Sequence, residues 1–259
     1  MPLRPLLFLF ALGLGACDAP KHGLTPTPPP TIAKAQASNQ DLAPAAMALP
    51  LRQVTRLTGG LKPEESGRWI VAIHGLGDTP ENFQNLSQGA NFKARWFFPA
   101  APHARDWYGG ARGGDGEKLE RNLELAAAIV AQYLEHLSAD PKNEGLPIVT
   151  GFSQGGMLSY ALVALYPERV SAALPIAGML PPSLWQKIGA AGRPAPPISA
   201  FHGRSDQVIP FAATETELLR LQAAGYPAQL TALDNVAHRI PEPLHRAWQA
   251  ALALQLARH

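Results

Sequence analysis

The sequence Gly151-Phe152-Ser153-Gln154-Gly155-Gly156 places a serine between glycines where the hydrophobic pattern of the chain changes. The apolar run 146–150 before it predicts a buried strand, and residues 157–166 after it predict a helix. A glycine-flanked serine between a strand and a helix is typical of a nucleophile elbow, a strained turn that raises the serine hydroxyl above a sheet. The glycines lack a Cβ and so allow the backbones to approach closely. We therefore take Ser153 as the candidate nucleophile and the Gln154 amide as a candidate oxyanion donor.

Ser153 needs partners, because a serine hydroxyl is a poor nucleophile until a histidine accepts its proton and an acid orients that histidine. In folds with this elbow, the acid and then the histidine follow the serine along the chain. The only aspartates after Ser153 are Asp206, directly after a predicted strand, and Asp234, which we interpret as a turn-capping residue. His238 lies in a loop, whereas the other histidines after Asp206 lie in a predicted helix and at the chain terminus. This order predicts Asp206 as the acid and His238 as the base.

A second oxyanion donor is expected from the loop after an early strand. The sequence His74-Gly75-Leu76-Gly77-Asp78-Thr79-Pro80 follows such an apolar strand, and its two glycines allow a sharp turn that leaves amides facing the cleft. Leu76 is the candidate donor, acting together with Gln154. His74 and His202 both stand at strand ends, and we interpret them as hydrogen-bonded structural histidines rather than as catalytic bases.

The first residues of the chain have the form of an export signal. Residues 1–16 contain Arg4 and then an apolar run that is too short to span a bilayer. Leu14-Gly15-Ala16-Cys17 resembles the lipobox of bacterial lipoproteins, in which the signal is cut before a cysteine that then carries lipid. Cys17 is the only cysteine, so the alternative is an ordinary secretory signal with an incidental thiol. We expect an exported lipoprotein, anchored through Cys17 to a membrane of the bacterial cell envelope and exposed to the periplasm.

Composition separates a tether from a globular region. Residues 17–50 are rich in proline and small polar residues and predict a flexible tether, whereas residues 51–259 have the length of one α/β domain. The formal net charge of +2 and the absence of a basic run with interleaved aromatics argue against a nucleic-acid partner. Metal catalysis is not indicated either, because the chain has no H-E-x-x-H motif and no cysteine pair.

Apolar runs and helical patterns alternate along the globular region. Such alternation predicts a mostly parallel sheet that helices cover on both faces, with ligands bound outside the carboxyl ends of the strands. The strands are expected at 69–74, 94–98, 146–150, 172–176, 198–202 and 229–233, and the helices at 117–137, 157–166, 214–224 and 241–256.

Together these motifs resemble the phospholipase/carboxylesterase family that includes the acyl-protein thioesterases. The resemblance covers about residues 69–256, and it implies an α/β-hydrolase fold, hydrolysis of carboxylic esters, thioesters or lysophospholipids, and no cofactor. The chain departs from the family in the glycine-rich run 109–116 and in its export signal and tether. We interpret the run as a solvated loop; the alternatives are that it forms a lid or that Arg112 binds an anionic group of the substrate. These departures argue against the protein substrates of the cytosolic thioesterases. The segments that carry the resemblance are the loop 74–79, the elbow 151–156, His202-Gly203 with Asp206, and His238.

The length of one connection limits how the site is covered. About twenty residues separate the strand 172–176 from the strand at 198, which leaves room for one flap but not for a large cap domain. We therefore expect an open, shallow cleft and the highest kcat/KM on esters with short to medium acyl chains, because each methylene contributes only while it is being buried. The expected apolar wall consists of Leu76, Trp107, Tyr108, Met179 and Leu180.

Other activities share the same nucleophile, base and oxyanion hole. A thioesterase or lysophospholipase of the same family is the main alternative to an esterase, and peptide cleavage or acyl transfer would need no different residues. A tethered binding lipoprotein with a catalytically dead fold is the alternative from another class of protein. It is disfavoured because the serine, the acid and the histidine are all present. The expected partners are a small ester or lipid-derived substrate and the membrane.

Overall fold

The computed structural model describes residues 51–103, 105–109, 116–190 and 192–258. The chain divides into two units, residues 1–42 and residues 43–259, and only the second contains described residues. The predicted signal, Cys17, the tether and most of the glycine-rich run 109–116 therefore lie outside the described residues.

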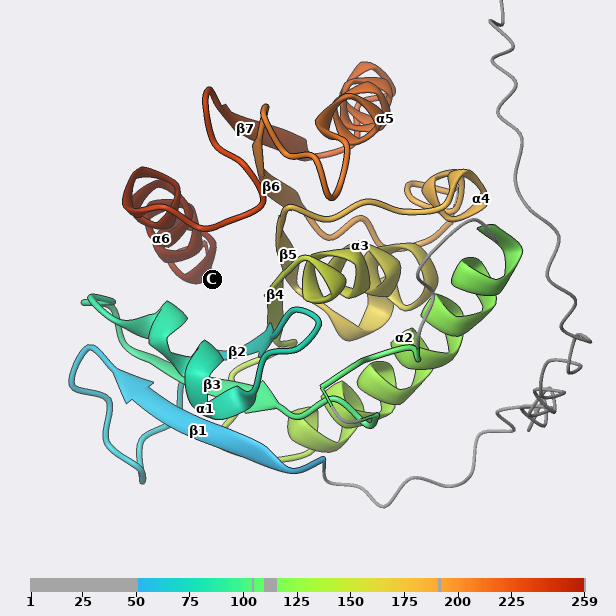
Figure 1. The fold of residues 1–259 in the computed structure, drawn as a ribbon. Coiled ribbons are helices and arrows are strands. Elements are labelled where there is room, and N and C mark those ends of the chain that lie inside the picture. The colour runs from blue at the N-terminus through green and yellow to red at the C-terminus, as the bar shows by residue number, and fades with distance from the viewer. Residues whose placement is uncertain (1–50, 104, 110–115, 191, 259) are drawn as a thin grey trace, which may run out of the picture. The chain divides into compact units, whose positions relative to one another are not determined.

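One sheet organises the described part of the chain (Figure 1), and its strand order is β1-β3-β2-β4-β5-β6-β7. Strands β2 to β7 run parallel to one another, and β1 pairs antiparallel with β3 at one edge. The strands are β1 (Gln53–Thr58), β2 (Trp69–Ile73), β3 (Ala94–Pro99), β4 (Ile148–Phe152), β5 (Ala172–Ile176), β6 (Ile198–Gly203) and β7 (Ala228–Leu233).

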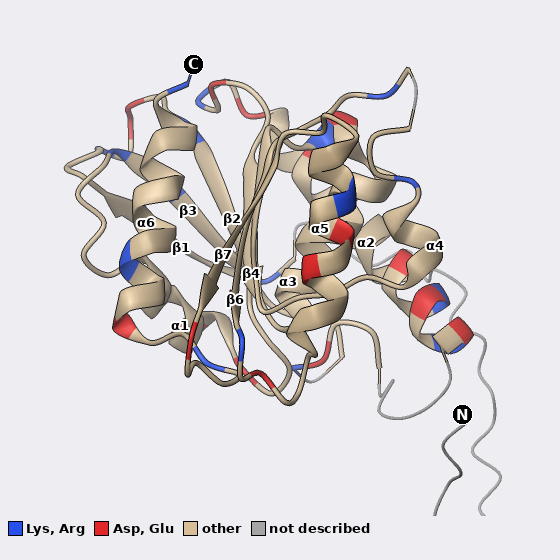
Figure 2. Cartoon of the chain, turned by 90° about the horizontal axis from the view of Figure 1, so that it is seen from above, with Lys and Arg blue, Asp and Glu red and all other residues tan. Residues whose placement is uncertain are grey.

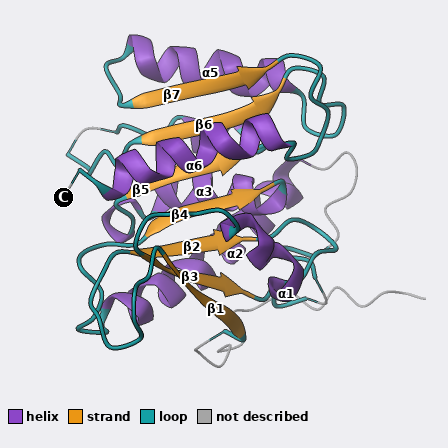
Figure 3. Cartoon of the chain, turned by 90° about the vertical axis from the view of Figure 1, so that its left-hand side faces the viewer, coloured by secondary structure: helices purple, strands orange, loops and turns teal. Residues whose placement is uncertain are grey.

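Helices cover both faces of this sheet, as the alternating pattern predicts. Figures 2 and 3 show α1 and α6 on one face and α2, α3 and α5 on the other. The helices are α1 (Pro80–Phe83), α2 (Gly116–Ser138), α3 (Gln154–Leu165), α4 (Pro182–Trp185), α5 (Phe211–Ala223) and α6 (Glu242–Leu256), and two short 3-10 helices are η1 (Gln84–Ser87) and η2 (Pro167–Arg169).

The core consists of two apolar layers, one on each side of the sheet, and β2 contributes to both. Successive side chains of a strand point to opposite faces. Trp69, Val71 and Ile73 accordingly join the layer under α2 and α3, while Ile70 and Ala72 join the layer under α6. All five residues are buried, which is why β2 reads as a continuous apolar run rather than as an alternating one.

Several element boundaries differ from the predictions for local reasons. Strand β4 begins two residues later than predicted, directly after Pro147, which has no N–H to donate to a neighbouring strand. Helix α3 begins at Gln154 rather than at residue 157, because Ser153 is its N-cap. The edge strand β1 was not predicted, and its half-buried pattern is weaker than that of the buried strands. Between β5 and β6, the described residues contain only the four-residue helix α4, so no cap domain stands there.

Candidate active site

Ser153 occupies a strained turn between β4 and α3. Its backbone angles, φ 56° and ψ −114°, lie in a region that L-residues rarely adopt. The Ser153 amide donates to the Ile176 carbonyl at 3.0 Å, which ties the turn to the end of β5. A Cβ on Gly151 would lie 2.5 Å from the Ile73 oxygen, and one on Gly155 would lie only 1.9 Å from that same atom. The glycines are therefore required because the elbow packs directly against the end of β2.

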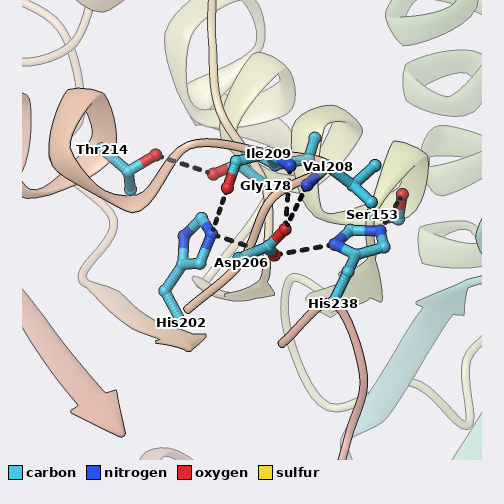
Figure 4. Close-up of polar contacts among 8 residues, drawn as sticks. All are labelled: Ser153, Gly178, His202, Asp206, Val208, Ile209, Thr214 and His238. Carbon is cyan, nitrogen blue, oxygen red and sulfur yellow. Dashed lines mark hydrogen bonds and ion pairs between the residues drawn. The ribbon is translucent and has the colours of Figure 1, made fainter. Parts of the chain in front are cut away.

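Ser153, His238 and Asp206 form a continuous hydrogen-bonded chain (Figure 4), although they come from three separate loops. The Nδ1 of His238 lies 2.7 Å from Asp206 Oδ2, and its Nε2 lies 2.9 Å from Ser153 Oγ. An ionised carboxylate only accepts hydrogen bonds, so Nδ1 carries the proton and donates it. In the neutral ring Nε2 is then unprotonated and can accept the hydrogen bond from the serine hydroxyl, the arrangement that a general base requires.

The carboxylate of Asp206 is buried and held by several donors. Its side chain is 0% exposed, and its Oδ1 accepts the backbone amides of Val208 and Ile209, each at 2.9 Å. Burial by itself would raise the pKa of the Asp206 carboxyl. The hydrogen bonds from His238, Ile209 and Val208 outweigh burial and hold this pKa below its ordinary value. Asp206 therefore stays ionised and fixed in orientation beneath His238.

His202 contributes one further contact to this carboxylate. It is buried at the end of β6, and its Nε2 lies 3.0 Å from the Ile209 carbonyl oxygen and 3.3 Å from Asp206 Oδ2. Burial lowers the pKa of His202, which favours the neutral ring. Since both neighbours of Nε2 are acceptors, Nε2 carries the proton of that ring and shares it between them. His202 thus acts as a structural donor, in agreement with the interpretation from its strand-end position.

Asp234, the alternative acid, is held elsewhere. Its side chain is 82% exposed, and its Oδ1 lies 3.2 Å from Nε of Arg204. Arg204 also lies 3.2 Å from Glu215 of α5 and stacks over the ring of Phe211. Asp234 therefore belongs to a surface ion-pair group that joins the loops after β6 and β7.

The two candidate oxyanion donors come from two segments next to Ser153. Leu76, in the loop after β2, lines the cavity beside Ser153, and Gln154 is the first residue of α3. Within the described ranges, the backbone amides of Leu76 and Gln154 have no hydrogen-bond acceptor. The Leu76 loop is fixed by the Gly77 amide, which donates to the Arg105 carbonyl at 2.9 Å. His74 supports the same loop, because its Nδ1 donates to the Gly75 carbonyl at 2.7 Å and its Nε2 accepts an amide at 3.2 Å. Burial lowers the pKa of His74 and keeps it neutral, as a structural histidine should be.

The Gln154 side chain has a separate role that the motif did not reveal. Its Oε1 accepts the Trp107 amide at 3.1 Å, and its Nε2 donates to Asp106 Oδ1 at 2.8 Å. Asp106 Oδ1 also accepts the amides of Tyr108 and Gly109. Gln154 therefore anchors the loop before the glycine-rich run to the nucleophile elbow.

The cavity beside Ser153 is small and open. Its volume is about 340 Å³, and it is lined by Gly75, Leu76, Gly77, Asp78, Phe152, Ser153 and His238. Phe152 was not among the predicted wall residues. Its ring lies 4.7 Å from the His238 ring, and its position between strand and nucleophile, as the second residue of the G-x-S motif, could have indicated that it lines the cleft.

The predicted apolar wall differs from this lining. Of its five members, only Leu76, with 39% of its surface exposed, lines the cavity. Trp107 and Tyr108 are buried, since the Trp107 ring donates to the His74 carbonyl at 3.0 Å and the Tyr108 hydroxyl contacts the Met157 sulfur. Two further members, Leu180, which is buried, and Met179, which is partly buried, also pack in the core layer around α3. Most of the large apolar side chains predicted for the wall therefore pack in the core beneath the cavity and do not line it.

The described residues offer neither a metal site nor a membrane-spanning helix. No group of three or more histidine, cysteine, aspartate or glutamate side chains there could hold a metal ion. Among the helices of the same residues, none is both long enough and apolar enough to span a bilayer.

The fold and the arrangement around Ser153 define an α/β-hydrolase. The structure of esterase PE8 matches with a TM-score of 0.67 and 24% identity, covering 78% of this chain and 100% of that one. The acyl-protein thioesterase 2 of Zea mays matches with a TM-score of 0.62 and 20% identity, covering 80% and 100% of the respective chains. At these identities the likeness shows the fold, and it confirms the predicted α/β-hydrolase architecture.

The chain belongs to the phospholipase/carboxylesterase family, whose sequence model matches residues 62–252. A probable carboxylesterase of Oryza sativa subsp. japonica is 29% identical over 196 residues, which cover 66% of this chain and 71% of that protein. The protein is therefore a carboxylic ester hydrolase, as the motifs predict. The roles of individual residues within the site remain predictions from sequence and geometry.

Proposed function

We propose that this hydrolase is a serine esterase that forms an acyl-enzyme on Ser153 and prefers esters with short to medium acyl chains. The observation that carries the proposal is the unbroken chain of contacts from Ser153 Oγ through His238 to Asp206, at 2.9 Å and 2.7 Å. Hydrogen bonds hold Asp206 ionised, and a neutral His238 with its proton on Nδ1 can take the hydroxyl proton of Ser153, as nucleophilic attack requires.

In the first half of the reaction, Ser153 Oγ attacks the ester carbonyl carbon while Nε2 of His238 takes the hydroxyl proton. The carbonyl oxygen becomes an oxyanion, which the amides of Leu76 and Gln154 stabilise. The bond to the leaving oxygen then breaks, and His238 gives its proton to the departing alcohol. Water repeats these steps on the acyl-enzyme and releases the acid, with the proton returning to Ser153. Asp206 holds the ring and stabilises its charged form throughout.

The size of the cavity supports the acyl-chain preference. About 340 Å³ lies near the lower end of the range for small-molecule sites, and the cavity is shared by the acyl group and the reacting carbon. Each buried methylene contributes about 0.8 kcal/mol, so the gain ends when the chain leaves the cavity.

A fluorophosphonate probe tests the nucleophile directly. We expect it to label the purified protein, and we expect Ser153→Ala to abolish both labelling and p-nitrophenyl butyrate hydrolysis. Asp206→Asn and Asp234→Asn form a matched pair, because both remove one negative charge from a loop near His238. Only Asp206→Asn should cost several orders of magnitude in kcat, since it alone changes the tautomer of the base. Labelling that survives Ser153→Ala, or the opposite ranking of the two variants, would refute the assignment.

We also propose that the protein is an exported lipoprotein held at a cell-envelope membrane through Cys17. The proposal rests on the sequence of the export signal and the lipobox-like segment. Two acyl chains on one cysteine would hold a protein stably at a bilayer, where a single chain binds only reversibly. Cys17→Ser should therefore release the enzyme from membranes or leave an unprocessed precursor. Normal processing with unchanged membrane fractionation in that variant would exclude lipidation at Cys17.

A further inference from the structure

A second cavity, of about 520 Å³, borders the Ser153 pocket and shares the wall residue Asp78 with it. It lies between the α1–η1 segment and the start of α6, which contributes Glu242. Ile240 forms part of its wall and stands two residues after His238 on the same loop. The loop that carries the base therefore leads from the reacting atoms to this cavity.

The geometry of the reaction indicates which half of the ester points there. In the tetrahedral intermediate, the oxyanion faces the amides of Leu76 and Gln154. The leaving oxygen must lie beside Nε2 of His238, because it receives its proton from that atom. The alcohol attached to this oxygen then follows the His238 loop toward Ile240. The second cavity is thus positioned for the alcohol half of the ester, and the acyl half remains in the smaller pocket.

Asp78 stands where the two cavities meet, and its carboxylate is preorganised. Its Oδ1 accepts the Thr79 amide at 2.8 Å and the Asn82 side-chain amide at 2.7 Å. Asn82 is itself fixed, since its backbone amide donates to the Thr79 hydroxyl at the start of α1. Within the described ranges, Oδ2 of Asp78 has no partner. A rigid carboxylate with one oxygen free is an acceptor for a hydrogen-bond donor on a ligand.

The rest of the lining combines apolar and polar side chains. Phe83, Leu86 and Ile240 form its apolar part. Asparagine and glutamine side chains from the α1–η1 segment add polar groups, and neither lysine nor arginine lines the cavity. Glu242 adds a second carboxylate, whose Oε1 lies 2.8 Å from Nε of Arg246. His245 also lines the cavity, and its Nε2 lies 2.8 Å from the Leu86 carbonyl oxygen. An apolar alcohol would desolvate the Asp78 oxygen without replacing its hydrogen bond, which costs free energy. An anionic leaving group would be repelled by the Asp78 carboxylate.

On this basis, and building on the proposed esterase function, we propose that the second cavity is a leaving-group subsite. It selects esters whose alcohol carries hydrogen-bond donors, either hydroxyl groups or a protonated amine, and Asp78 is its recognition residue.

Two pairs of butyrate esters with alcohols of equal heavy-atom number test the proposal. Glycerol 1-butyrate is compared with 2-methylbutyl butyrate, and protonated 2-(dimethylamino)ethyl butyrate is compared with 3-methylbutyl butyrate. A hydrogen bond to a charged group contributes about 1.5–3 kcal/mol, so kcat/KM should be at least about tenfold higher for the donor-bearing member of at least one pair. The pair that shows the preference identifies hydroxyl or ammonium as the recognised group. Equal or lower kcat/KM for both donor-bearing esters would overturn the proposal.

Substitutions test whether Asp78 causes the preference for donor-bearing alcohols. Asp78→Asn should reduce the kcat/KM ratio within the preferred pair about tenfold. Asp140→Asn is the matched control, because Asp140 also accepts a backbone amide in an exposed turn but lies after the end of α2 and lines neither cavity. Its ratio should equal that of the wild type. If Asp78→Asn folds poorly, Glu242→Gln tests the same cavity. Glu242 is exposed at the start of α6 and pairs with Arg246, so the kcat/KM ratio should fall only about threefold.

The failure of this inference can be distinguished from failure of the proposed function. Suppose that the enzyme hydrolyses p-nitrophenyl butyrate but that Asp78→Asn changes the kcat/KM ratio within the preferred pair by less than twofold. The proposed esterase function would then stand, and the proposed subsite would be refuted. An enzyme that hydrolyses none of these esters would refute both.

Discussion

The buried His202 offers a test of how Asp206 is held in place, because it touches the acid and not the substrate. We predict that His202→Leu, which keeps an apolar side chain of similar size but removes the donor, lowers both activity and stability. His202→Gln should restore much of the loss, since a glutamine amide can place an N–H near the position of the imidazole Nε2.

The magnitude follows from the two acceptors that His202 serves. Its Nε2 lies 3.0 Å from the Ile209 carbonyl and 3.3 Å from Asp206 Oδ2, and all these groups are buried. Leaving a buried acceptor without its donor costs about 1–3 kcal/mol, so the free energy of unfolding should fall by about that amount. The Asp206 carboxylate would also be less firmly oriented toward His238. If about 1.4 kcal/mol of this loss appears in the transition state, kcat falls about tenfold.

The assay separates positioning from general destabilisation. We would measure kcat and KM for p-nitrophenyl butyrate well below the unfolding temperature of each variant, with urea unfolding in parallel. The expected result is a lower kcat with a nearly unchanged KM in His202→Leu and a substantial recovery in His202→Gln. If His202→Leu loses stability but keeps the wild-type kcat, or if both variants are equally impaired, His202 does not act through Asp206.

Three further predictions concern packing, pH and substrate. Gly155→Ala should destabilise the fold by about 3 kcal/mol or more, because its Cβ would lie 1.9 Å from the Ile73 backbone oxygen. Gly116→Ala is the control and should not destabilise the fold, because a Cβ there has nothing within 4 Å. Equal unfolding temperatures for the two variants would contradict this prediction. Burial lowers the pKa of His74 and His202, so below about pH 6.5 the unfolded chain binds more protons than the folded one and the free energy of unfolding should fall on acidification. The lowered pKa of Asp206 extends this fall below about pH 4. A free energy of unfolding in urea that does not change from about pH 8 to about pH 4 would contradict this reasoning. Across p-nitrophenyl esters, kcat/KM should rise over the first several acyl carbons and then level off, and a steady rise through long chains with strong triglyceride hydrolysis would show a deeper acyl site than the cavity provides.

Sequence reasoning predicted the parallel strands, and it predicted that the candidate triad residues lie together, for the same physical reason. Buried strands appear as apolar runs, and in a parallel sheet their carboxyl ends meet at one edge, so loops far apart in sequence converge. The loops after β4, β6 and β7 indeed bring Ser153, Asp206 and His238 within hydrogen-bond distance. The glycine positions of the elbow were equally readable, because only glycine fits beside the Ile73 carbonyl.

Features set by tertiary packing could not be read in the same way. Trp107 and Tyr108 are large apolar residues near the site, and only the packing against α3 and β2 shows that they lie in the core and not on the cavity wall. The edge strand β1 has a half-buried pattern that resembles a loop until its partner β3 is known. The second cavity depends on α6 lying beside η1, where His245 contacts Leu86 across about 160 residues of sequence.

The reversed direction of β1 determines on which side the described chain enters the domain. Because β1 runs antiparallel to β3, its first residue, Gln53, lies opposite Pro99, at the edge of the sheet where the strands β2 to β7 end. The Ala100 amide donates to the Arg52 carbonyl at 2.7 Å and fixes this entry point. Helix α6 runs back to the other edge, where Leu256 lies in one cavity wall with Gly67 and Arg68, residues that precede β2. A solid support or fusion partner joined directly before β1 would therefore lie on the side of the sheet that carries Ser153. A reporter joined after α6 would lie on the opposite side and leave the cleft clear.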